Sequence, residues 1–234
     1  MTEGADGPPD PMHIGVRAFG LVASPEGLTF EWTDRIPRAR GLGSSAATIA
    51  LGMVAATKWT GQELALEDLL ARGGPLEGHS DNLAASLAGG ACLTWNGRIA
   101  RVADGLPVTP IVVIPGRQVR TSEARLALPD RVSHADAAFN VGRAALLGAG
   151  IAGSNPELLA AAFEDRLHEP YRPSPLLDSI RSELPAGAVG ATLSGSGPTV
   201  IAWADDPVTC AAELEKRFPE ETVMVLPVSS QGAH

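Results

Sequence analysis

The sequence predicts a protein with two halves, of which the second belongs to the α+β class. Two observations support this expectation. A strand pair that turns at Asn96-Gly97, a strong hairpin signal, closes a first half that is otherwise mostly helical. The apolar run Thr109–Pro115 then predicts a buried strand, beyond which helical patterns are followed by further apolar strands. We therefore expect one domain over residues 1–106 and a second over residues 107–234.

The first half is expected to begin irregularly and then to form a series of helices. Residues 1–11 are rich in Gly, Pro and Asp, which favours a loop or a frayed end over a first strand. Two helices are expected to end at glycine pairs, Gly73-Gly74 and Gly89-Gly90, because glycine readily adopts a positive φ. The expected helices are Ile14–Val22, Ser44–Trp59, Leu64–Arg72 and Asp81–Leu87, and the expected strands are Leu28–Trp32, Ala91–Trp95 and Arg98–Val102.

The second half is expected to combine several helices with a few short strands. After the strand at Thr109–Pro115 the apolar residues recur mostly at helical spacing, and two runs near residues 190 and 200 have the composition of buried strands. The expected helices are Ser122–Leu128, Ala135–Leu147, Pro156–Glu164, Leu176–Leu184 and Pro207–Arg217, and the expected strands are Val189–Leu193, Thr199–Ala204 and Val223–Val228.

Composition argues against several classes of protein. Of the 234 residues, 44% are hydrophobic and 19% are charged, which suits a globular chain with a core and not a disordered one. A formal net charge of -9 without a Lys/Arg cluster makes nucleic acid a poor partner. Cys92 and Cys210 are too few for a disulfide framework, so we expect both in the core and the protein in a reducing compartment. No apolar run reaches about 18 residues, so we expect no membrane partner and a cytoplasmic location.

The run Pro37–Ala46 is the most informative part of the chain, because it joins a loop to the start of an apolar helix. Gly41 and Gly43 allow positive φ and remove side chains that would keep a ligand from the backbone. Ser44 and Ser45 can cap the helix, whose first N–H groups and dipole favour an anion. The run lacks the Lys-Ser/Thr pair of a Walker A loop. Taken alone, it is equally explained by a turn followed by a capped helix.

Glu77–Asn82 is a second polar cluster, between the end of one helix and the start of the next. Glu77 and Asp81 could bind Mg²⁺, which prefers carboxylate oxygens. Alternatively, Asp81 or Ser80 simply caps the following helix. His79 by itself is more often an ordinary loop histidine.

Two further clusters carry arginines. Thr121 and Arg125 are four residues apart and share one face of an expected helix, where Arg125 could bind a substrate carboxylate with two parallel bonds. A helix cap followed by a solvated arginine explains the same pattern. The charged stretch Glu164–Arg172 would by default be a solvated surface loop.

Gly190–Thr199 is a second Gly-Ser loop, placed between two apolar strands. A tight β-turn accounts for its glycines as well as a ligand does. Two such loops in one chain nevertheless strengthen the expectation of a phosphate-binding site.

Five segments, taken in order, resemble the GHMP family of small-molecule kinases, and within it the branch that phosphorylates homoserine. Pro37–Ala46 matches the phosphate loop of that family almost letter for letter, and Gly190–Thr199 is similar to its third motif. Glu77–Asn82 is similar to the segment beside the metal and the substrate, and Thr121–Arg125 and Asp165–Arg172 resemble two stretches typical of the branch. The resemblance covers nearly the whole chain.

The resemblance implies a two-domain α+β GHMP-kinase fold and transfer of phosphate from ATP to the hydroxyl of homoserine, with Mg²⁺ as cofactor and with a homodimer as the assembly. It implies ATP-phosphate binding by Arg40, Gly41, Leu42, Gly43, Ser44, Ser45 and Ala46, and metal binding by Ser45 and Glu77. It implies substrate binding by His79, Asp81, Asn82, Thr121, Arg125, Arg172, Ser194, Gly195 and Gly197.

The resemblance also implies two catalytic residues, Asn82 and Arg125. Several GHMP kinases use an aspartate as general base, but the branch resembled here has Asn at that place, with Asp81 as the alternative base. Catalysis would then depend on positioning and on stabilisation of the charge on the transferred phosphoryl group.

The start of the chain departs from the family. The first family motif, of the type Pro-x-x-x-Asn-Leu-Gly-x-Gly-Phe-Asp, has no counterpart in residues 1–40. We therefore expect an incomplete N-terminal domain that lacks its first strands. Two alternatives to homoserine phosphorylation remain: a non-catalytic remnant that binds nucleotide, or a GHMP kinase for another small alcohol such as mevalonate or a sugar.

Overall fold

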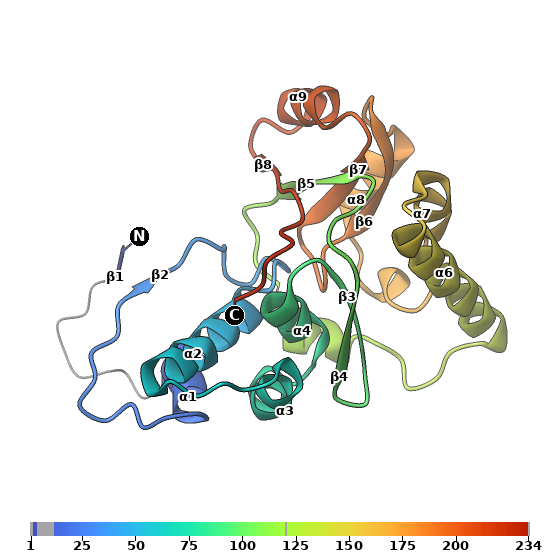
Figure 1. Cartoon of the computed structure of the whole chain (residues 1–234). Coiled ribbons are helices and arrows are strands. Elements are labelled where there is room, and N and C mark those ends of the chain that lie inside the picture. The colour runs from blue at the N-terminus through green and yellow to red at the C-terminus, as the bar shows by residue number, and fades with distance from the viewer. Residues whose placement is uncertain (1, 4–11, 120, 234) are drawn as a thin grey trace. The chain divides into compact units, whose positions relative to one another are not determined.

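The computed structural model describes residues 2–3, 12–119 and 121–233, and these form two compact units (Figure 1). The helical unit comprises the described residues of the segments Met1–Pro37, Gly43–Asp104 and Ser229–His234. The sheet unit comprises Arg38–Leu42 and Gly105–Val228. The division of the chain into domains at residues 106 and 107 stays a prediction.

The helical unit is built around α2 (Ser44–Thr60), the longest of its helices in the described part of the chain. Glycines in left-handed conformations bound α2 at both ends, Gly43 before it and Gly61 after it. Gly52 in its middle touches the first helix so closely that a Cβ would lie 2.3 Å from the carbonyl oxygen of Gly15. Small residues therefore let these two helices pack backbone to backbone. The other elements are α1 (Ile14–Gly20), α3 (Leu66–Glu77), α4 (Asp81–Ala88), β1 (Thr2–Glu3), β2 (Trp32–Thr33), β3 (Ala91–Trp95) and β4 (Arg98–Ala103).

The core of the helical unit is apolar and comes mainly from α2, α3 and α4. Its fully buried members include Ile49, Met53, Leu83 and Leu87, with Leu70 almost as deeply buried. The predicted hairpin is confirmed: β3 pairs with β4 in antiparallel fashion on either side of Asn96-Gly97.

Three predictions for the helical unit are corrected. The expected strand at Leu28–Trp32 is mostly loop, because Phe30 packs against the rings of Phe19 and Trp32 and only Trp32–Thr33 forms β2. Thr2–Glu3, expected to be irregular, forms β1 and pairs with β2; residues 4–11 lie outside the described part.

The third correction concerns α3, which does not end at Gly73-Gly74 but continues to Glu77. Gly73 is in the helix because of packing: a Cβ there would lie 2.7 Å from the terminal methyl of Met53. The left-handed residue that ends the helix is Gly78.

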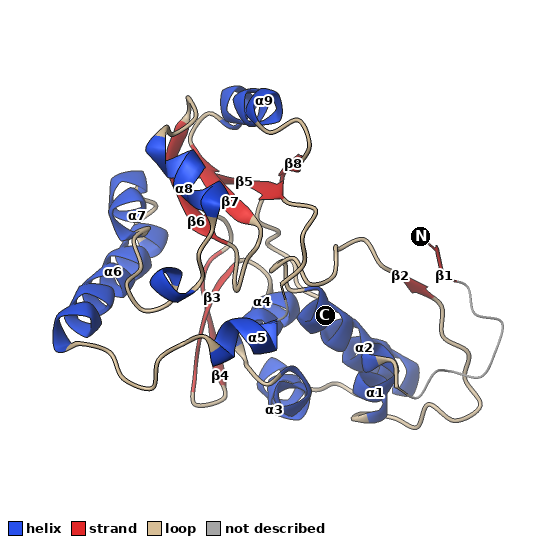
Figure 2. Cartoon of the chain, turned by 180° about the vertical axis from the view of Figure 1, so that it is seen from behind, coloured by secondary structure: helices blue, strands red, loops and turns tan. Residues whose placement is uncertain are grey.

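The sheet unit contains an antiparallel sheet in the order β6-β7-β5-β8 (Figure 2). In its register, Val113 of β5 lies opposite Val200 of β7 on one side and Val223 of β8 on the other. The strands are β5 (Thr109–Ile114), β6 (Ala188–Leu193), β7 (Val200–Ala204) and β8 (Thr222–Val225), and the helices are α5 (Thr121–Leu126), α6 (His134–Ala152), α7 (Pro156–Ala162), α8 (Pro175–Ser182) and α9 (Pro207–Arg217).

Helices α8 and α9 cover the sheet and close its core. They contribute Leu177, Ile180, Cys210 and Leu214, which pack with the buried side chains of β5, β6 and β7. Three helices of this unit begin with proline directly after a capping side chain: Asn155 before α7, Ser174 before α8 and Asp206 before α9. This pattern is a strong start signal, since proline has no N–H to leave unpaired.

The expectation that both cysteines lie in the core is met in part. Cys210 is buried, and burial raises the pKa of its thiol to about 11, whereas Cys92 is only partly buried.

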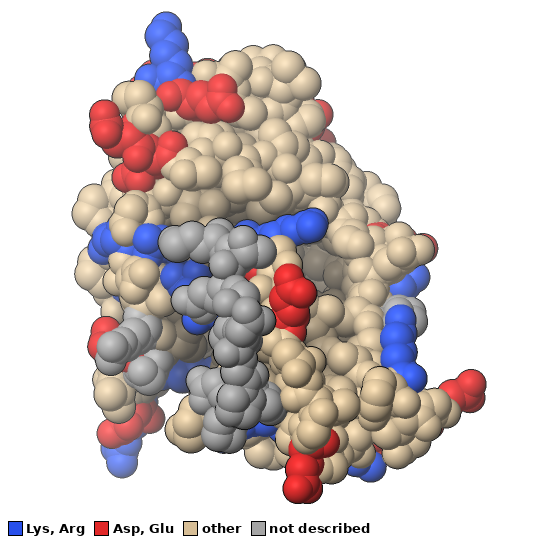
Figure 3. Space-filling model, turned by 90° about the vertical axis from the view of Figure 1, so that its left-hand side faces the viewer, with Lys and Arg blue, Asp and Glu red and all other residues tan. Residues whose placement is uncertain are grey.

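None of the helices formed by residues 2–3, 12–119 and 121–233 combines the length and the apolar character that a membrane crossing requires. Acidic and basic side chains are mixed on the face drawn in Figure 3.

Candidate functional site

The loop Pro37–Ala46 is shared between the two units, and the chain passes from the sheet unit to the helical unit between Leu42 and Gly43. Its first part, Arg38–Leu42, is held by backbone contacts inside the sheet unit. The carbonyl of Arg40 accepts a hydrogen bond from the N–H of Thr199 (3.3 Å), and that of Gly41 accepts one from the Ser194 hydroxyl (2.8 Å). The first part of the loop is thus built into the unit that carries the second Gly-Ser loop.

Gly41 and Gly43 are required for different reasons. Both have a positive φ, 80° and 72°. A Cβ on Gly41 would lie 2.2 Å from the carbonyl oxygen of Ser194 and 2.7 Å from that of Gly197. A Cβ on Gly43 would meet nothing closer than the Asn82 side chain, at 3.8 Å. The expectation that the missing side chain of Gly41 makes room for a ligand is therefore corrected, because the protein's own backbone fills the space on the side where a Cβ would lie.

The start of α2 is left without a side-chain cap. Gly43 is the N-cap residue, Ser44 is the first residue of the helix, and no side chain in the described part of the molecule caps its first N–H groups. The expectation that Ser44 or Ser45 caps the helix is thus wrong. The uncapped donors and the dipole of α2 leave an end that attracts anions.

Ser45 belongs to a chain of polar contacts within the helical unit. Its hydroxyl donates to Oε2 of Glu77 at 2.5 Å, and Oε1 of Glu77 lies 3.4 Å from Nε2 of His79. Nδ1 of His79 contacts Oδ1 of Asp81. The Glu77 side chain is only 5% exposed and that of Asp81 is 75% exposed. The structure therefore brings together the predicted metal ligands and two predicted substrate ligands of this unit.

Asp81 is poorly suited to act as a base. Burial acts to raise the pKa of its carboxyl, but hydrogen bonds from the N–H of Asn82 and from His79 outweigh this effect and hold the pKa below its ordinary value. Such a carboxylate stays ionised and binds a proton weakly. Asp81 also does not cap α4 in the expected way, since Ser80 is the N-cap residue and makes no side-chain cap.

Ser45 and Glu77 fit a magnesium ion as part of its ligand set. They offer a hydroxyl and a carboxylate oxygen, the donors that Mg²⁺ takes from proteins while substrate phosphates and water fill the remaining positions. Among the described residues, no group of three or more His, Cys, Asp and Glu side chains is arranged to hold a metal ion without such help.

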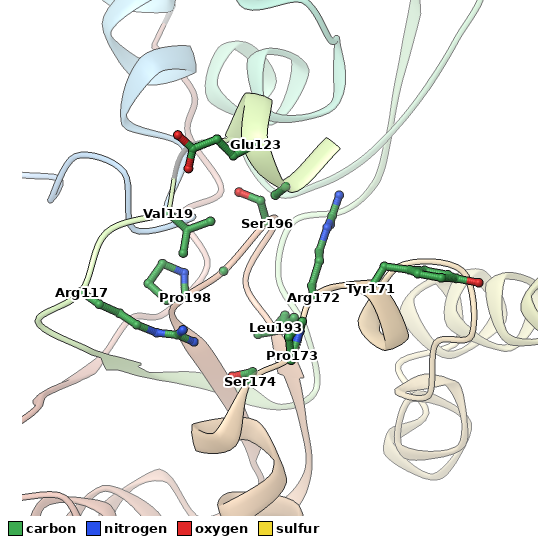
Figure 4. A pocket seen from close by; sticks show the side chains of 12 residues that line it. Arg117, Val119, Glu123, Tyr171, Arg172, Pro173, Ser174, Leu193, Ser196 and Pro198 are labelled. Carbon is green, nitrogen blue, oxygen red and sulfur yellow. The ribbon is translucent and has the colours of Figure 1, made fainter. Parts of the chain in front are cut away.

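The sheet unit contains a pocket of about 220 Å³ (Figure 4). Within this unit, the Thr121 hydroxyl lies 3.4 Å from that of Ser196. Predicted site residues are therefore gathered here too. The pocket is lined by Arg117, Val119, Glu123, Ala124, Tyr171, Arg172, Pro173, Ser174, Leu193, Ser196, Gly197 and Pro198.

Arg172 is a partly buried cation at this pocket. Its Nη1 donates to the carbonyl of Gly195 (3.3 Å), and its buried Nε has no hydrogen-bond partner among the described residues. Burial lowers the pKa of the Arg172 guanidinium; Asp165 opposes this effect, and the positive charge of Arg125 adds to it. Two arginines therefore lie near enough to repel each other, an arrangement that an anion would relieve.

The charged stretch before Arg172 is not the solvated loop of the default expectation. Oδ1 of Asp165 accepts from Nδ2 of Asn140 (2.7 Å) and from the N–H of Leu167 (2.6 Å). Glu169 pairs with Arg181 at 2.7 Å. These bonds fix the segment that positions Arg172.

Sequence reasoning missed two charged residues of the pocket, Arg117 and Glu123. Glu123 lies inside a segment that was singled out for its neighbours Thr121 and Arg125. Nothing in the sequence around Arg117, which follows the strand β5 and Gly116, marks it as a pocket residue.

Comparison with known proteins defines the class first. The family model described as GHMP kinases N terminal domain matches residues 13–90, and that described as GHMP kinases C terminal matches residues 137–220. The chain belongs to the GHMP kinase family, a family of phosphotransferases, and the expected α+β GHMP-kinase fold is confirmed.

The relatives narrow the class to one branch. A protein of Streptomyces coelicolor named homoserine kinase is 44% identical over 212 aligned positions, and the match covers 85% of this chain and 68% of the relative. A homoserine kinase of a Mycobacterium species is 42% identical over 87% of this chain and 68% of its own length. The chain thus spans about two thirds of the length of these relatives.

Solved structures agree with this assignment. The crystal structure of homoserine kinase from Cytophaga hutchinsonii superposes with a TM-score of 0.77 at 28% identity, covering 85% of this chain and 69% of that one. A galactokinase of Lactococcus lactis, at 17% identity and a TM-score of 0.63, covers 98% of this chain and 77% of its own and shares the fold alone.

Proposed function

We propose that this chain transfers the γ-phosphoryl group of ATP to the hydroxyl of L-homoserine, giving O-phospho-L-homoserine and ADP, a step of threonine biosynthesis. The observation that carries this proposal is the 44% identity, over 85% of the chain, to a relative named homoserine kinase. The arginine pair of the sheet unit supports it, because homoserine carries an α-carboxylate whereas a sugar does not.

The glycine loop and the start of α2 are proposed to hold the ATP phosphates. The first N–H groups of α2 lack a side-chain cap, and a phosphate oxygen is the kind of acceptor they lack. Gly41 and Gly43 set the backbone turns on either side of Leu42. Within this loop the ligand groups are proposed to come from the backbone of Gly41–Ala46.

Ser45 and Glu77 are proposed to hold Mg²⁺. The contact of 2.5 Å between their oxygens places a hydroxyl and a carboxylate side by side. When bound, the ion would neutralise charge on the transferred phosphoryl group. The residues themselves keep the carboxylate buried and aimed at the hydroxyl at the start of α2.

Roles in homoserine binding are proposed separately for residues of the sheet unit and for residues of the helical unit. Arg125 and Arg172 would bind the α-carboxylate, because guanidinium groups match its geometry in pairs of bonds. Thr121, Ser194, Gly195 and Gly197 would support this arrangement, as the Thr121–Ser196 and Arg172–Gly195 contacts indicate. In the helical unit His79, Asp81 and Asn82 are proposed to contact the substrate.

No strong general base is part of the proposal. Asn82 carries an amide in the place of a base, and the pKa of Asp81 is held below its ordinary value. Asn82 and Arg125 would act by orienting the homoserine hydroxyl and carboxylate. Positioning of this kind is the main protein contribution to phosphoryl transfer, where the transition state is loose and the charge spread.

A coupled assay of ADP release tests the substrate directly. Purified protein with ATP and Mg²⁺ would be offered L-homoserine, L-threonine, mevalonate and galactose in parallel. We expect turnover with homoserine to exceed that with the other alcohols. Equal turnover, or a preference for mevalonate or galactose, would assign the chain to another small alcohol. Nucleotide binding without turnover would mark a non-catalytic remnant.

Arg125→Ala tests the carboxylate site. Loss of one member of a charge pair costs about 2–5 kcal/mol, so the KM for homoserine should rise by on the order of 10²-fold while the KM for ATP changes little. Arg131→Ala, at an exposed position of the loop after α5, serves as the control. Equal changes in both KM values would show that Arg125 is a scaffold residue.

By the same resemblance we propose a homodimer in the cytoplasm. Light scattering behind a size-exclusion column tests the assembly, and a monomer at all concentrations would contradict it. The expectations that nucleic acids and membranes are not partners stay predictions.

A further inference from the structure

We infer that Arg40 is a positioning residue that holds one wall of the pocket in the sheet unit, and not a ligand of the ATP phosphates. The inference deepens the proposed function and rests on it, because the wall in question lines the same pocket as Arg172, which is proposed to bind homoserine.

The first observation is the direction of the Arg40 side chain. Its Nη2 donates to the carbonyl of Gly116 at 2.7 Å, a bond between residues 76 positions apart. Its Nη1 is buried and has no hydrogen-bond partner among the described residues. A phosphate cannot reach a buried nitrogen unless the side chain swings away, and that movement would break the bond to Gly116.

The second observation is that the backbone beside Arg40 is tied to the same wall. The N–H of Val119 donates to the carbonyl of Ala39 at 3.0 Å. Arg40 and Ala39 therefore hold the segment Gly116–Val119 at two points, one through a side chain and one through the backbone. Arg117 and Val119 in this segment line the pocket (Figure 4).

The third observation concerns another part of the pocket lining. The carbonyl of Arg40 accepts from the N–H of Thr199, and that of Gly41 accepts from the Ser194 hydroxyl. Leu193 and the residues Ser196–Pro198 line the pocket. The segment Arg38–Leu42 thus contacts both parts of the pocket lining, and it reaches Gly116 through the guanidinium of Arg40. Removing that bond should loosen the wall that carries Arg117 without touching the N–H groups of α2.

Kinetics of Arg40→Ala and Arg40→Lys test this role. A misplacement of about 1 Å can cost on the order of 10²-fold, so we expect the KM for homoserine to rise on the order of tenfold or more in Arg40→Ala. The KM for ATP should change by less than about twofold, since the start of α2 is unaltered. Arg40→Lys keeps one donor for the Gly116 carbonyl and should recover part of the loss. Arg131→Ala is again the control.

A rise in the KM for ATP with that for homoserine unchanged would overturn the inference in favour of a phosphate ligand. Equal rises in both, or no rescue by lysine, would overturn it in favour of a general structural role.

Hydrogen exchange gives a readout that needs no activity. In either Arg40 variant the N–H of Val119 should exchange faster than in the wild type, and more so in Arg40→Ala. Unchanged exchange over residues 116–119 in both variants would contradict the inference. If the wild type shows no turnover with homoserine, the proposed function fails by itself, while the exchange experiment still decides whether Arg40 holds this wall. If Arg40→Ala does not fold, Arg40→Lys carries both measurements.

Discussion

One polar cluster in the helical unit and two arginines in the sheet unit are held in different ways. In the helical unit Ser45, Glu77 and His79 contact one another through their side chains. In the sheet unit Arg40 and Arg172 each donate to a backbone carbonyl, those of Gly116 and Gly195. Side chains that are paired with side chains can exchange partners when a ligand arrives, whereas bonds to backbone fix a loop. The comparison teaches that the cluster of Ser45, Glu77 and His79 is held by side-chain pairs, whereas Arg40 and Arg172 are held by backbone carbonyls.

The same difference divides the glycine loop. Gly41, in the sheet unit, is in close contact with the backbone of Ser194 and Gly197, while a Cβ on Gly43, in the helical unit, would make only an ordinary contact with the Asn82 side chain at 3.8 Å. Gly41 and Gly43 flank Leu42. Glycine is required at position 41 because of close packing as well as its positive φ, and at position 43 because of its positive φ alone.

Replacing Gly41 or Gly43 by alanine should give the largest effect and should distinguish the packing role of Gly41 from the conformational role of Gly43. A left-handed conformation costs about 1–2 kcal/mol and overpacking about 1–3 kcal/mol, so Gly41→Ala should lower the free energy of unfolding by about 2–5 kcal/mol. Gly43→Ala meets only the first cost, about 1–2 kcal/mol. Urea unfolding measures both. Equal losses in the two variants would remove the distinction between the two parts of the loop.

Glu77→Gln should reduce activity while leaving the fold intact. The amide keeps an acceptor for the Ser45 hydroxyl but removes the negative charge that is proposed to bind Mg²⁺. Loss of one group that stabilises the transferred charge costs on the order of 10²-fold in kcat. Steady-state kinetics at several Mg²⁺ concentrations measure this effect, with the exposed Glu67→Gln of the same helix as control. Wild-type kinetics in Glu77→Gln would place the metal elsewhere.

Asp165→Ala should destabilise the sheet unit in a pH-dependent way. Burial acts to raise the pKa of Asp165, but hydrogen bonds from Asn140 and Leu167 and the charge of His168 outweigh it, so the pKa lies below its ordinary value. A carboxyl with a depressed pKa stabilises the fold above its unfolded-state pKa of about 3.9, and this contribution is lost as the pH falls through the folded-state pKa.

The free energy of unfolding of Asp165→Ala should therefore be lower by about 1–3 kcal/mol at pH 7. The difference from the wild type should shrink below about pH 4. Urea unfolding at several pH values measures it, and Asp130→Ala, which removes an exposed carboxylate, is the control. A difference that does not depend on pH would show that Asp165 acts through packing.

Local signals explain the elements that the sequence predicts well. Asn96-Gly97 fixes the hairpin of β3 and β4, and Asp206 with Pro207 fixes the start of α9. The segments that carry the resemblance to GHMP kinases also contain residues that contact one another within each unit. Ser45 with Glu77 and Thr121 with Ser196 are examples.

Tertiary packing explains the failures. Gly73-Gly74 has the local signature of a helix end, yet α3 continues because Gly73 is needed beside Met53. The glycine at position 41 has the signature of a ligand site, but the backbone of a segment some 150 residues later fills the space (Gly41–Ser194, separation 153). The hydrogen bond from Asn140 to Asp165, between residues 25 positions apart, was likewise not foreseeable from a charge run. Such partners are distant in the sequence, so local patterns carry no trace of them.

Phosphorus NMR of the reaction mixture tests the central claim most directly. The protein would be incubated with ATP, Mg²⁺ and L-homoserine, and the fate of the γ-phosphate would be followed in time. The account predicts that the γ signal of ATP is replaced by ADP and by a phosphomonoester that co-resonates with added O-phospho-L-homoserine. Formation of inorganic phosphate alone, or an ATP spectrum that does not change, would contradict it.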